Sequence, residues 1–538
     1  MNANFFEAGG DSLIAISVAM SAANEGLDLT PQDLYENPTI AALGTVLVDR
    51  YAAGGLARRT LGDAEHPPVP PNVEHFLERG LRDARRWRTP VVLQLDPGTK
   101  VGDVAAVLSA VTDHHDALRL RLVQRAGIWE QQIDEPLASS EDSTVEFTGL
   151  ATASLPDETE PGSNQERQAV MDILNDRIRQ PDATDAPLVA TYVTGAQDGP
   201  CYLAISVHGV AGDGMSRDIL LTDLFTAFGQ RLAGEPIVLA PVATSWREWS
   251  QRCASLATHP AVVESRDFWL DTTTRADVWL TNGDPPLPPG PDDLFRLASQ
   301  LAATQATEID DARRRLEVTV DEILLAALSR TIALIVGPGV VAVDLDGSGR
   351  SVLKPDLDTR RTVGWLTTVY PLALSCAKDD GKGVRQLLDD VHETVKAVPH
   401  YGIGYGLLRY LHAPTARRLV TARPADIHFT YVGTIPDLSS MTSGDLPVKL
   451  DPDAAMPVRE TIPGLGHPLE LRVYRHGGVL YLDWWYDRRR IEPAVAQSFA
   501  ERFRTELIEL ARGAIAEDET ESSGDELELV DLSSVDAG

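Results

Sequence analysis

The chain has 538 residues, a net charge of −32, 43% hydrophobic residues and three cysteines. Its length predicts two or three domains, because one hydrophobic core rarely organises so long a chain. The acidic balance argues against nucleic acid as a partner, and three widely spaced cysteines disfavour a disulfide framework or a cysteine-rich metal site. No apolar run approaches the roughly 18 residues of a membrane helix, and the start has no signal-peptide pattern. We therefore expect a cytoplasmic protein that binds neither nucleic acid nor membrane.

The first fifty residues predict a small helical unit. In F-F-E-A-G-G-D-S-L, residues 5–13, a glycine turn precedes a helix N-cap, which places the Ser12 hydroxyl at a helix start. An isolated G-D-S would only be a cap. This stretch, however, resembles the phosphopantetheine attachment motif of peptidyl and acyl carrier proteins, and L-Y-E-N-P-T-I-A-A-L at residues 34–43 resembles their closing helices.

The carrier resemblance implies that Ser12 carries 4'-phosphopantetheine and that the cargo is an aminoacyl or peptidyl thioester. In that family a first helix precedes the motif, whereas here the sequence starts almost at the motif. We therefore expect residues 1–51 to be a partial carrier domain, with a truncated or misplaced start or with a damaged fold. A glycine hinge and a proline stretch predict a linker at residues 52–68.

From about residue 69 to residue 513 the pattern alternates strand-like runs with helices, which is typical of an α/β fold. The alternation falls into two halves, which we place at residues 69–270 and 271–513. Strands are expected at Val91, Cys201, Val340 and Val479. Helices are expected at residues 101–118, 164–178, 217–228, 308–316 and 494–510.

The loop V-H-G-V-A-G-D-G-M-S at residues 207–216 lies between a predicted strand and a predicted helix, where functional residues are often found. Its outline is H-x-x-x-x-D-G, with His208, Asp213 and Gly214 in place and Gly209 directly after the histidine. The loop resembles the HHxxxDG motif of the condensation superfamily of nonribosomal peptide synthetases.

Further segments carry the same resemblance. H-H-D-A-L-R at residues 114–119 and T-S-W-R-E-W at residues 244–249 resemble shared segments of the superfamily, and we interpret the double histidine as a packing feature. Four later segments resemble the epimerization branch: D-G-S-G-R-S at 346–351, R-T-V-G-W-L-T at 361–367, G-I-G-Y-G-L-L-R-Y-L at 402–411 and F-T-Y-V-G at 429–433. The resemblance implies two chloramphenicol-acetyltransferase-like α/β lobes forming a tunnel, preceded by a small partial α-helical carrier bundle.

Inverting the α-carbon of an aminoacyl thioester requires acid/base groups on opposite sides of the carbon. In the family these are the second histidine of HHxxxDG and the glutamate of E-G-H-G-R-E. Here they align with Gly209, which has no side chain, and with Asp346, whose carboxylate lies about 1.5 Å further back. Ser348 replaces a further histidine. Losing a positioned general base costs about 10²- to 10⁴-fold in rate, so the resemblance implies an impaired site.

Other motif residues are kept, and the resemblance gives them structural roles. His208 is expected to be a hydrogen-bonded packing group, and Gly214 is expected to allow a close turn. Asp213 should form an ion pair with Arg350, because this pair holds the loop in the family. The pattern therefore predicts a preserved scaffold around missing chemistry.

Three functions stay open. In the leading one, the domain binds, gates or presents the carrier-bound thioester without inverting it efficiently. In the second, the protein remains an epimerase with Asp346 as one proton shuttle and water or Tyr431 as the other. In the third, it is a non-catalytic platform that recruits tailoring enzymes, a hypothesis that rests on fold-level analogy.

The C-terminal residues predict an interaction segment or a solubilising tail. Residues 517–536 contain nine acidic residues and no basic one, alternating with leucine and valine towards the end. We expect residues 514–538 to be disordered. As a docking segment, the tail would bind upstream or downstream synthetase domains or subunits through a basic partner.

Overall fold

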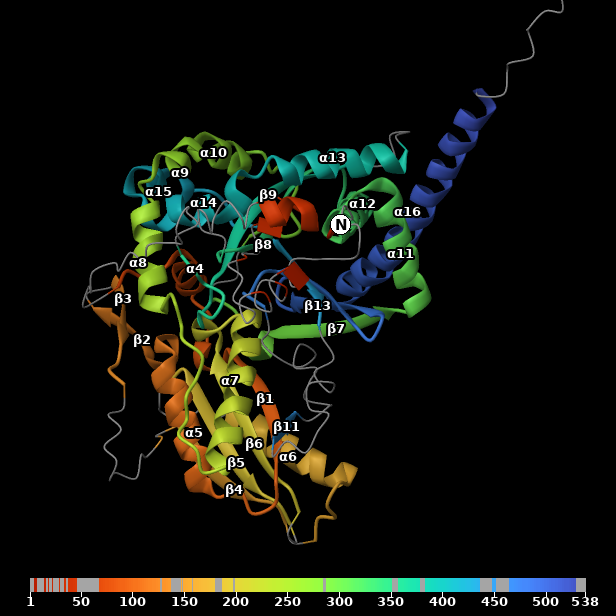
Figure 1. Ribbon diagram of the computed structural model, residues 1–538. Coiled ribbons are helices and arrows are strands. Elements are labelled where there is room, and N and C mark those ends of the chain that lie inside the picture. The colour runs from red at the N-terminus through yellow and green to blue at the C-terminus, as the bar shows by residue number, and fades with distance from the viewer. Residues whose placement is uncertain are drawn as a thin grey trace, which may run out of the picture.

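The computed structural model describes most of the chain from residue 67 onward. The described residues are 4–6, 14, 15, 18, 22, 29, 33, 34, 37–45, 67–125, 128–136, 147, 149–156, 158–179, 186–196, 199–283, 287–350, 357–377, 383–435, 448–450 and 464–528. Ser12 and residues 52–66 of the predicted linker lie outside this set. The described part forms two lobes, each built on its own β-sheet (Figure 1).

The N-terminal lobe is a five-stranded sheet with the order β11-β1-β6-β5-β4. Its strands are β1 (Arg88–Leu95), β4 (Leu150–Ser154), β5 (Leu188–Thr194), β6 (Cys201–His208) and β11 (Val448–Leu450). Its main helices are α5 (Val101–His114), α6 (Asn164–Arg179) and α7 (Gly214–Leu232). The first six residues of β6 are all buried, because β1 and β5 pair with its two edges and helices cover its faces. A strand buried on both faces reads as a continuous apolar run, as C-Y-L-A-I-S does here.

The C-terminal lobe is a six-stranded sheet with the order β7-β13-β12-β10-β8-β9. Its strands are β7 (Leu294–Leu301), β8 (Gly339–Ser348), β9 (Thr367–Cys376), β10 (Ile427–Thr434), β12 (Leu469–His476) and β13 (Val479–Asp487). The helices packed on it are α11 (Ala303–Leu316), α12 (Val320–Ile335), α13 (Val384–Lys396) and α16 (Pro493–Glu528). β10 runs parallel to its neighbours β8 and β12, while the other pairs are antiparallel.

Short helices and a hairpin surround the junction between the lobes, on the left of Figure 1. They are α4 (Pro71–Arg79), α8 (Trp246–Leu256), α9 (Pro260–Glu264), α10 (Arg266–Thr274), α14 (Ile403–Gly406), α15 (Ala413–Leu419) and the hairpin β2 (Leu120–Arg125) with β3 (Ile128–Ile133). Single turns are η1 (Ala84–Arg86), η2 (Asp116–Arg119), η3 (Gly209–Ala211), η4 (Pro291–Asp293), η5 (Pro399–Gly402) and the π-helical η6 (Leu407–Leu411). Among the described residues, no helix combines the length and the apolar character needed to span a bilayer.

The strands and helices predicted from periodicity are confirmed. Most of their ends differ by a few residues, but the last helix continues to Glu528, well past its predicted end at residue 510. The expected strands are β1, β6, β8 and β13, and the expected helices are α5, α6, α7, α11 and α16. The three cysteines are buried and unpaired. Apolar periodicity was sufficient here because each of these elements buries one face or both.

The two lobes exchange elements across the expected division at residue 270. β11 belongs to the C-terminal half of the chain, yet it pairs with β1 in the N-terminal sheet, with Leu93 opposite Leu450. α8 precedes the division and packs against η6 of the other lobe, while α10 spans the division and packs against α15 and β9. Pairing between segments so far apart in sequence leaves no local pattern, so the sequence predicts only one boundary.

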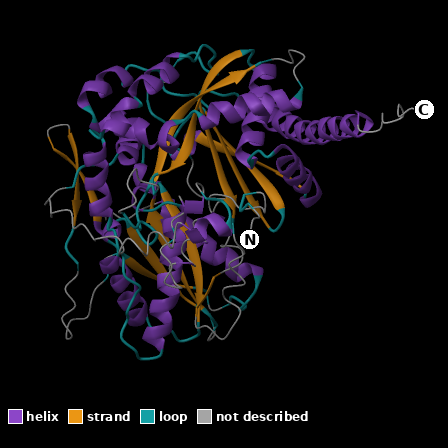
Figure 2. Ribbon diagram, turned by 45° about the horizontal axis from the view of Figure 1, so that its top comes forward, coloured by secondary structure: helices purple, strands orange, loops and turns teal. Residues whose placement is uncertain are grey.

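For residues 514–528 the structure shows helix where the sequence analysis expected disorder. α16 continues to Glu528 and extends away from the body of the molecule (Figure 2). Its first half packs on α11 and α12 through a stripe of buried side chains: Phe499, Phe503, Leu507, Leu510 and Ala514. An established helix gains one hydrogen bond per added residue without a new nucleation cost, so helix can continue into the acidic sequence. Residues 529–538 lie outside the described set.

Candidate functional site

The loop expected to hold the chemistry follows β6 of the N-terminal lobe. β6 ends at His208, η3 makes one tight turn, and α7 begins at Gly214. Asp213 caps α7, because its Oδ1 accepts the backbone N–H of Ser216 at 2.9 Å and the Ser216 hydroxyl at 2.8 Å. A side-chain oxygen at this position satisfies N–H groups that the first helical turn leaves unpaired.

The predicted ion pair between Asp213 and Arg350 is confirmed. Nη2 of Arg350 lies 2.7 Å from Oδ1 of Asp213, with 6% and 7% of the two side chains exposed. Nη1 of Arg350 donates to the carbonyls of Thr359 and Thr362 at 2.9 Å, and Oδ2 of Asp213 accepts the Leu366 N–H at 3.1 Å. Both Nη atoms of Arg350 and both carboxylate oxygens of Asp213 therefore make hydrogen bonds, and the pair ties the loop to the segment that follows β8.

His208 is a packing group, as the sequence predicts, and Gly209 leaves the next position without a side chain. The Nε2–H of His208 donates to the Ala84 carbonyl at 2.9 Å, while Nδ1 accepts the Val210 N–H at 3.2 Å. Burial, reinforced by the charge of Arg88, lowers the pKa of His208 to about 4. Because both ring nitrogens are engaged and the ring is neutral, His208 is not arranged to exchange protons with a bound substrate.

The glycines of the motifs differ in whether a larger residue would fit in their place. Gly214 has no left-handed φ, and an added Cβ would meet no atom within 4 Å, so the expected role in a close turn is wrong. At Gly349 an added Cβ would lie 1.9 Å from the carbonyl oxygen of Leu366. Gly364 has a φ of +150°, and an added Cβ would lie 2.2 Å from the Trp246 ring. The positions that require glycine are therefore Gly349 and Gly364, which belong to the C-terminal half of the chain.

Asp346 lies on β8 with both carboxylate oxygens engaged. Oδ1 is 3.1 Å from Nε2 of His428, and Oδ2 accepts the Thr430 hydroxyl at 2.8 Å. The Asp346 side chain is 26% exposed. Ser348 follows on the same strand as its last residue. The surviving carboxylate is thus paired with a histidine that the motif comparison did not identify.

Tyr431, the alternative proton shuttle, is not brought together with Asp346. Successive side chains of a strand point to opposite faces of the sheet. On β10 this places His428 and Thr430, the partners of Asp346, on one face, and Phe429 and Tyr431 on the other. Phe429 is 3% exposed, and Tyr431 packs against the same hydrophobic core.

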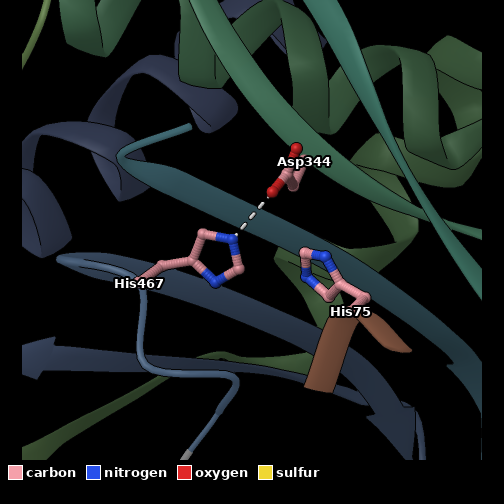
Figure 3. Close-up of side chains that lie close together, drawn as sticks. All are labelled: His75, Asp344 and His467. Carbon is pink, nitrogen blue, oxygen red and sulfur yellow. Dashed lines mark hydrogen bonds and ion pairs between the residues drawn. The ribbon is translucent and has the colours of Figure 1, made fainter. Parts of the chain in front are cut away.

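A row of polar residues crosses the sheet next to Asp346. The strand register places Asp344 of β8 beside His428 of β10, and His428 beside Glu470 of β12. His467, in the loop before β12, has its Nε2 2.8 Å from Oδ2 of Asp344 and its Nδ1 3.4 Å from Oε1 of Glu470. His75 of α4 reaches the same place from the other side (Figure 3).

The charges of this row depend on one another. Burial acts to lower the pKa of His428, but the carboxylates of Asp346 and Glu470 outweigh it and raise the pKa to about 10. Burial acts to raise the pKa of Asp344, but the hydrogen bond with His467 outweighs it and lowers the pKa to about 2. Glu470 has its pKa lowered in the same way by the two histidines. His428 is therefore a buried imidazolium between carboxylates.

Sequence reasoning missed the histidines and Glu470 in this row. A signal was present in the strands, where polar residues alternate with apolar ones in D-L-D at residues 344–346, H-F-T at 428–430 and E-L-R at 470–472. Alternation predicts a polar face, but the sequence does not say which strands are neighbours. His467 and His75 lie outside the strands and come together only in the fold.

The double histidine at residues 114 and 115 is structural, as expected. His115 is buried, and its Nε2 lies 2.8 Å from Oδ2 of Asp223. The other oxygen of Asp223 accepts a hydrogen bond from Arg361 at 2.5 Å. His114 reaches the Ala240 carbonyl at 2.8 Å. The carboxylate is thus already paired with a permanent positive charge.

The described positions of the first 45 residues form a small core of their own. Ala15, Leu29, Leu34 and Leu43 are buried together. The Phe5 N–H donates to the Pro38 carbonyl at 2.6 Å, which places the start of the attachment motif beside the closing segment.

Comparisons with known proteins place the two parts of the chain. Residues 75–528 match the family described as condensation domain. The chain belongs to the condensation-domain family. Residues 1–47 match the family described as phosphopantetheine attachment site, so the cofactor of this segment is phosphopantetheine.

Two relatives show how far the likeness to other condensation-domain proteins extends. The chain is 53% identical to a phenolphthiocerol/phthiocerol polyketide synthase subunit of Mycobacterium bovis, over 100% of this chain and 36% of that protein. It is 28% identical to a linear gramicidin synthase subunit of Brevibacillus parabrevis, over 94% of this chain and 10% of that protein. The chain therefore spans about a third or less of these relatives.

Solved structures share the fold of the condensation domain. The epimerization domain from the third module of tyrocidine synthetase B superposes with a TM-score of 0.70 at 20% identity, covering 86% of this chain and 100% of that one. The X-domain from teicoplanin biosynthesis superposes with a TM-score of 0.65 at 17% identity, covering 85% and 97%. The predicted two-lobed α/β fold is thereby confirmed.

Proposed function

We propose that the chain is a carrier and condensation-type didomain of a multidomain synthase, whose condensation-type domain binds the carrier-bound thioester without efficiently inverting its α-carbon. The observation that carries the proposal is the loop at residues 207–216. Its Asp213–Arg350 pair is buried and intact, while the position of the second motif histidine is Gly209. The scaffold is present, and the side chain that would move the proton is not.

The remaining acid/base candidates support the same conclusion. Asp346 accepts hydrogen bonds from two donors, one of them the charged His428 ring, and a carboxylate stabilised in this way is a weaker base. His208 uses both ring nitrogens within the protein. Inversion requires a proton donor opposite the base, and Tyr431 lies on the other face of β10 from the partners of Asp346.

We place the cofactor arm on Ser12 and divide the chain into a carrier at 1–51, a linker at 52–68 and two lobes at 69–270 and 271–513. The match of residues 1–47 to the phosphopantetheine attachment family supports the first assignment. Incubation of the full chain with coenzyme A and a phosphopantetheinyl transferase should add one arm by mass spectrometry. Ser12→Ala should abolish the addition, and an arm retained by that variant would refute the assignment.

Two classes of cargo are proposed for the arm. The resemblance to the epimerization branch favours an aminoacyl or peptidyl thioester. The mycobacterial relative at 53% identity is named a polyketide synthase subunit, which favours an acyl chain. Loading the carrier with each class from the corresponding coenzyme A thioester, and comparing protection of the thioester from hydrolysis, would separate them. The thioester of the preferred class should hydrolyse more slowly on the intact chain than on free phosphopantetheine.

The test of the impaired site is deuterium exchange at the α-carbon of an aminoacyl group loaded on the full chain in heavy water. We expect no exchange above that of an Asp346→Ala variant, and no loss of configuration in the released amino acid. Exchange in the wild-type chain that disappears in Asp346→Ala would overturn the proposal and support the second candidate, an active epimerase. That candidate is favoured only by the partial exposure of Asp346 beside His428.

A non-catalytic platform for tailoring enzymes stays a third proposal without a supporting contact. Docking to partner subunits through residues 514–538 is a related proposal, and the observation relevant to it is the helical extension of α16. Removal of residues 529–538 should weaken capture of neighbouring synthase subunits if the segment is a docking element, and should leave it unchanged if the segment only adds charge.

A further inference from the structure

Three potential metal ligands meet in the C-terminal lobe at a place that the thioester chemistry does not use. His75 of α4, Asp344 of β8 and His467 before β12 each offer one ligand atom, and these atoms lie within 4.8 Å of one another (Figure 3). His467 is completely buried, and Asp344 is 7% exposed. The three residues are separated by 269 and 123 positions in the chain, so only the fold assembles them.

The ring of His467 is oriented as it is in metal sites. Its Nε2 faces Asp344, while its Nδ1 lies 3.4 Å from Oε1 of Glu470. The same Glu470 oxygen also accepts the His467 backbone N–H at 2.9 Å. A histidine that binds a metal through one nitrogen usually gives its other ring N–H to a carboxylate, which fixes the ring and its tautomer. Glu470 lies next to that outer position, although Nδ1 of His467 makes no hydrogen bond among the described residues and would have to move closer to donate to it.

His75 is arranged in a similar way. The Tyr410 hydroxyl donates its single proton to Oε2 of Glu78 at 2.6 Å, so the 3.1 Å contact between Tyr410 and Nδ1 of His75 needs the proton on Nδ1. Nε2 of His75 then carries a bare lone pair. This atom is buried and has no hydrogen-bond partner among the described residues. A buried ring nitrogen without a partner is a cost that a bound ion would remove.

The charge balance also differs from that of other buried carboxylates in the protein. Asp213 is paired with Arg350, and Asp223 is paired with Arg361. In the part of the chain that the structure describes, the ion-pair partners of Asp344 and Glu470 are histidines alone. These two carboxylates therefore face titratable histidines, one of them the charged His428 ring beside Glu470, rather than an arginine. A divalent ion would add a permanent positive charge next to Asp344.

We propose that His75, Asp344 and His467 bind a divalent transition-metal ion, with Zn²⁺ the best match to two imidazole nitrogens and one carboxylate oxygen. Ligand bonds of about 2.0–2.1 Å in a tetrahedron place ligating atoms about 3.3 Å apart. The present 2.8 Å between His467 and Asp344 therefore has to open by about half an ångström. The ion would fasten α4, from the N-terminal half of the chain, to β8 and to the start of β12.

Two further groups of potential ligands exist among the described residues: His428, His467 and Glu470, which shares His467 with the proposed site, and the rival cluster of His114, His115 and Asp223, which provides the internal control. The ligand atoms of the rival cluster also lie within 4.8 Å of one another. Arg361 already neutralises Asp223 there, and its guanidinium would repel an incoming cation. We therefore assign the ion to His75, Asp344 and His467 rather than to the rival cluster.

The test uses the full chain, freed of metal with a chelator and dialysed against Zn²⁺. Elemental analysis should give one zinc per chain in the wild type and in His114→Ala, and close to none in His75→Gln and in His467→Ala. Co²⁺ in place of Zn²⁺ should give the visible absorption of a four-coordinate site in the wild type and in His114→Ala, but not in His75→Gln or His467→Ala. Circular dichroism checks folding, and His75→Gln decides the result if His467→Ala fails to fold.

Two outcomes would overturn the proposal. One is a wild-type protein that retains no more zinc than the His75→Gln variant, which would leave the cluster as a hydrogen-bonded network. The other is loss of the metal in His114→Ala, which would move the site to the rival cluster. Neither outcome affects the proposed function, because the deuterium-exchange test does not depend on this site.

Discussion

Asp213 and Asp344 are both buried carboxylates on loops or strands near the junction of the lobes, but their partners differ. Asp213 meets the permanent charge of Arg350 and backbone N–H groups, whereas Asp344 meets the titratable ring of His467. An arginine pair has one charge state and one geometry, so the first region behaves as a fixed clamp. Histidines can change protonation or bind an ion, so the second region has a state that conditions can alter.

The two regions also differ in which residues of the family motifs they contain. The clamp holds the loop that contains Gly209, a residue with no side chain that could carry a proton. The only carboxylate that survives from the epimerization pattern, Asp346, lies instead at the edge of the histidine region, hydrogen-bonded to His428. The clamp therefore joins the loop of the N-terminal lobe to the segment after β8, while ionisable residues surround Asp346 in the C-terminal lobe.

The largest expected effect comes from removing one side of the clamp. Arg350→Ala leaves Asp213 buried and unpaired, which should lower the free energy of unfolding by about 3–5 kcal/mol. Urea denaturation of the full chain measures this change in the free energy of unfolding. Arg231→Ala, which breaks an exposed pair with Asp103, is the matched control and should cost less than about 1 kcal/mol. Equal losses of stability in the two variants would show that breaking the buried Asp213–Arg350 pair costs no more than breaking an exposed ion pair.

The next effect tests the close contact behind the loop. Gly364→Ala would place a Cβ 2.2 Å from the Trp246 ring at a φ of +150°, and overpacking of this kind costs about 1–3 kcal/mol. Gly229→Ala in α7, where an added Cβ meets nothing within 4 Å, should instead stabilise the helix by up to about 1 kcal/mol. Thermal unfolding should show a lower melting temperature for Gly364→Ala and a higher one for Gly229→Ala. Destabilisation in both variants would contradict the claim that the close contact with Trp246 is what requires glycine at residue 364.

The pH dependence of stability tests the packing role of His208. Its pKa of about 4 lies below the usual 6.5, so the unfolded chain takes up a proton between pH 6.5 and 4 that the folded chain refuses. Stability should fall as pH decreases through this window, by at most about 1.4 kcal/mol per pH unit from this group. His208→Gln should flatten the difference between pH 7 and 5. A variant with an unchanged slope would show that His208 titrates freely, despite Arg88 and the two hydrogen bonds.

Much of the fold and of the clamp could be predicted from sequence, because both leave local signals. The buried strand before His208 and the amphipathic helix after it follow from periodicity, and Asp213 with Arg350 follows from two motifs at recognisable spacing. The histidine region could not be predicted in the same way. His75, Asp344, His428, His467 and Glu470 come together through strand order and through packing of α4 on the sheet, neither of which is encoded in a local pattern.

The role of Gly214 shows the reverse error. The motif suggested a conformational need, yet the position has open space and an ordinary φ. The demand for glycine lies at Gly349 and Gly364 instead, where a carbonyl oxygen and a tryptophan ring approach the backbone. Contacts from outside the loop impose these demands, so the loop sequence alone could not show them.

The most direct measurement compares α-carbon deuterium exchange in the wild-type chain with exchange in a variant that restores the family pattern, Gly209→His with Asp346→Glu and Ser348→His. If the clamp preserves a working scaffold and only the acid/base groups are missing, the restored variant should exchange at least about 10²-fold faster on the same loaded substrate. Equal rates in the two proteins would contradict the account, because either the wild type already has its chemistry or the scaffold no longer supports it.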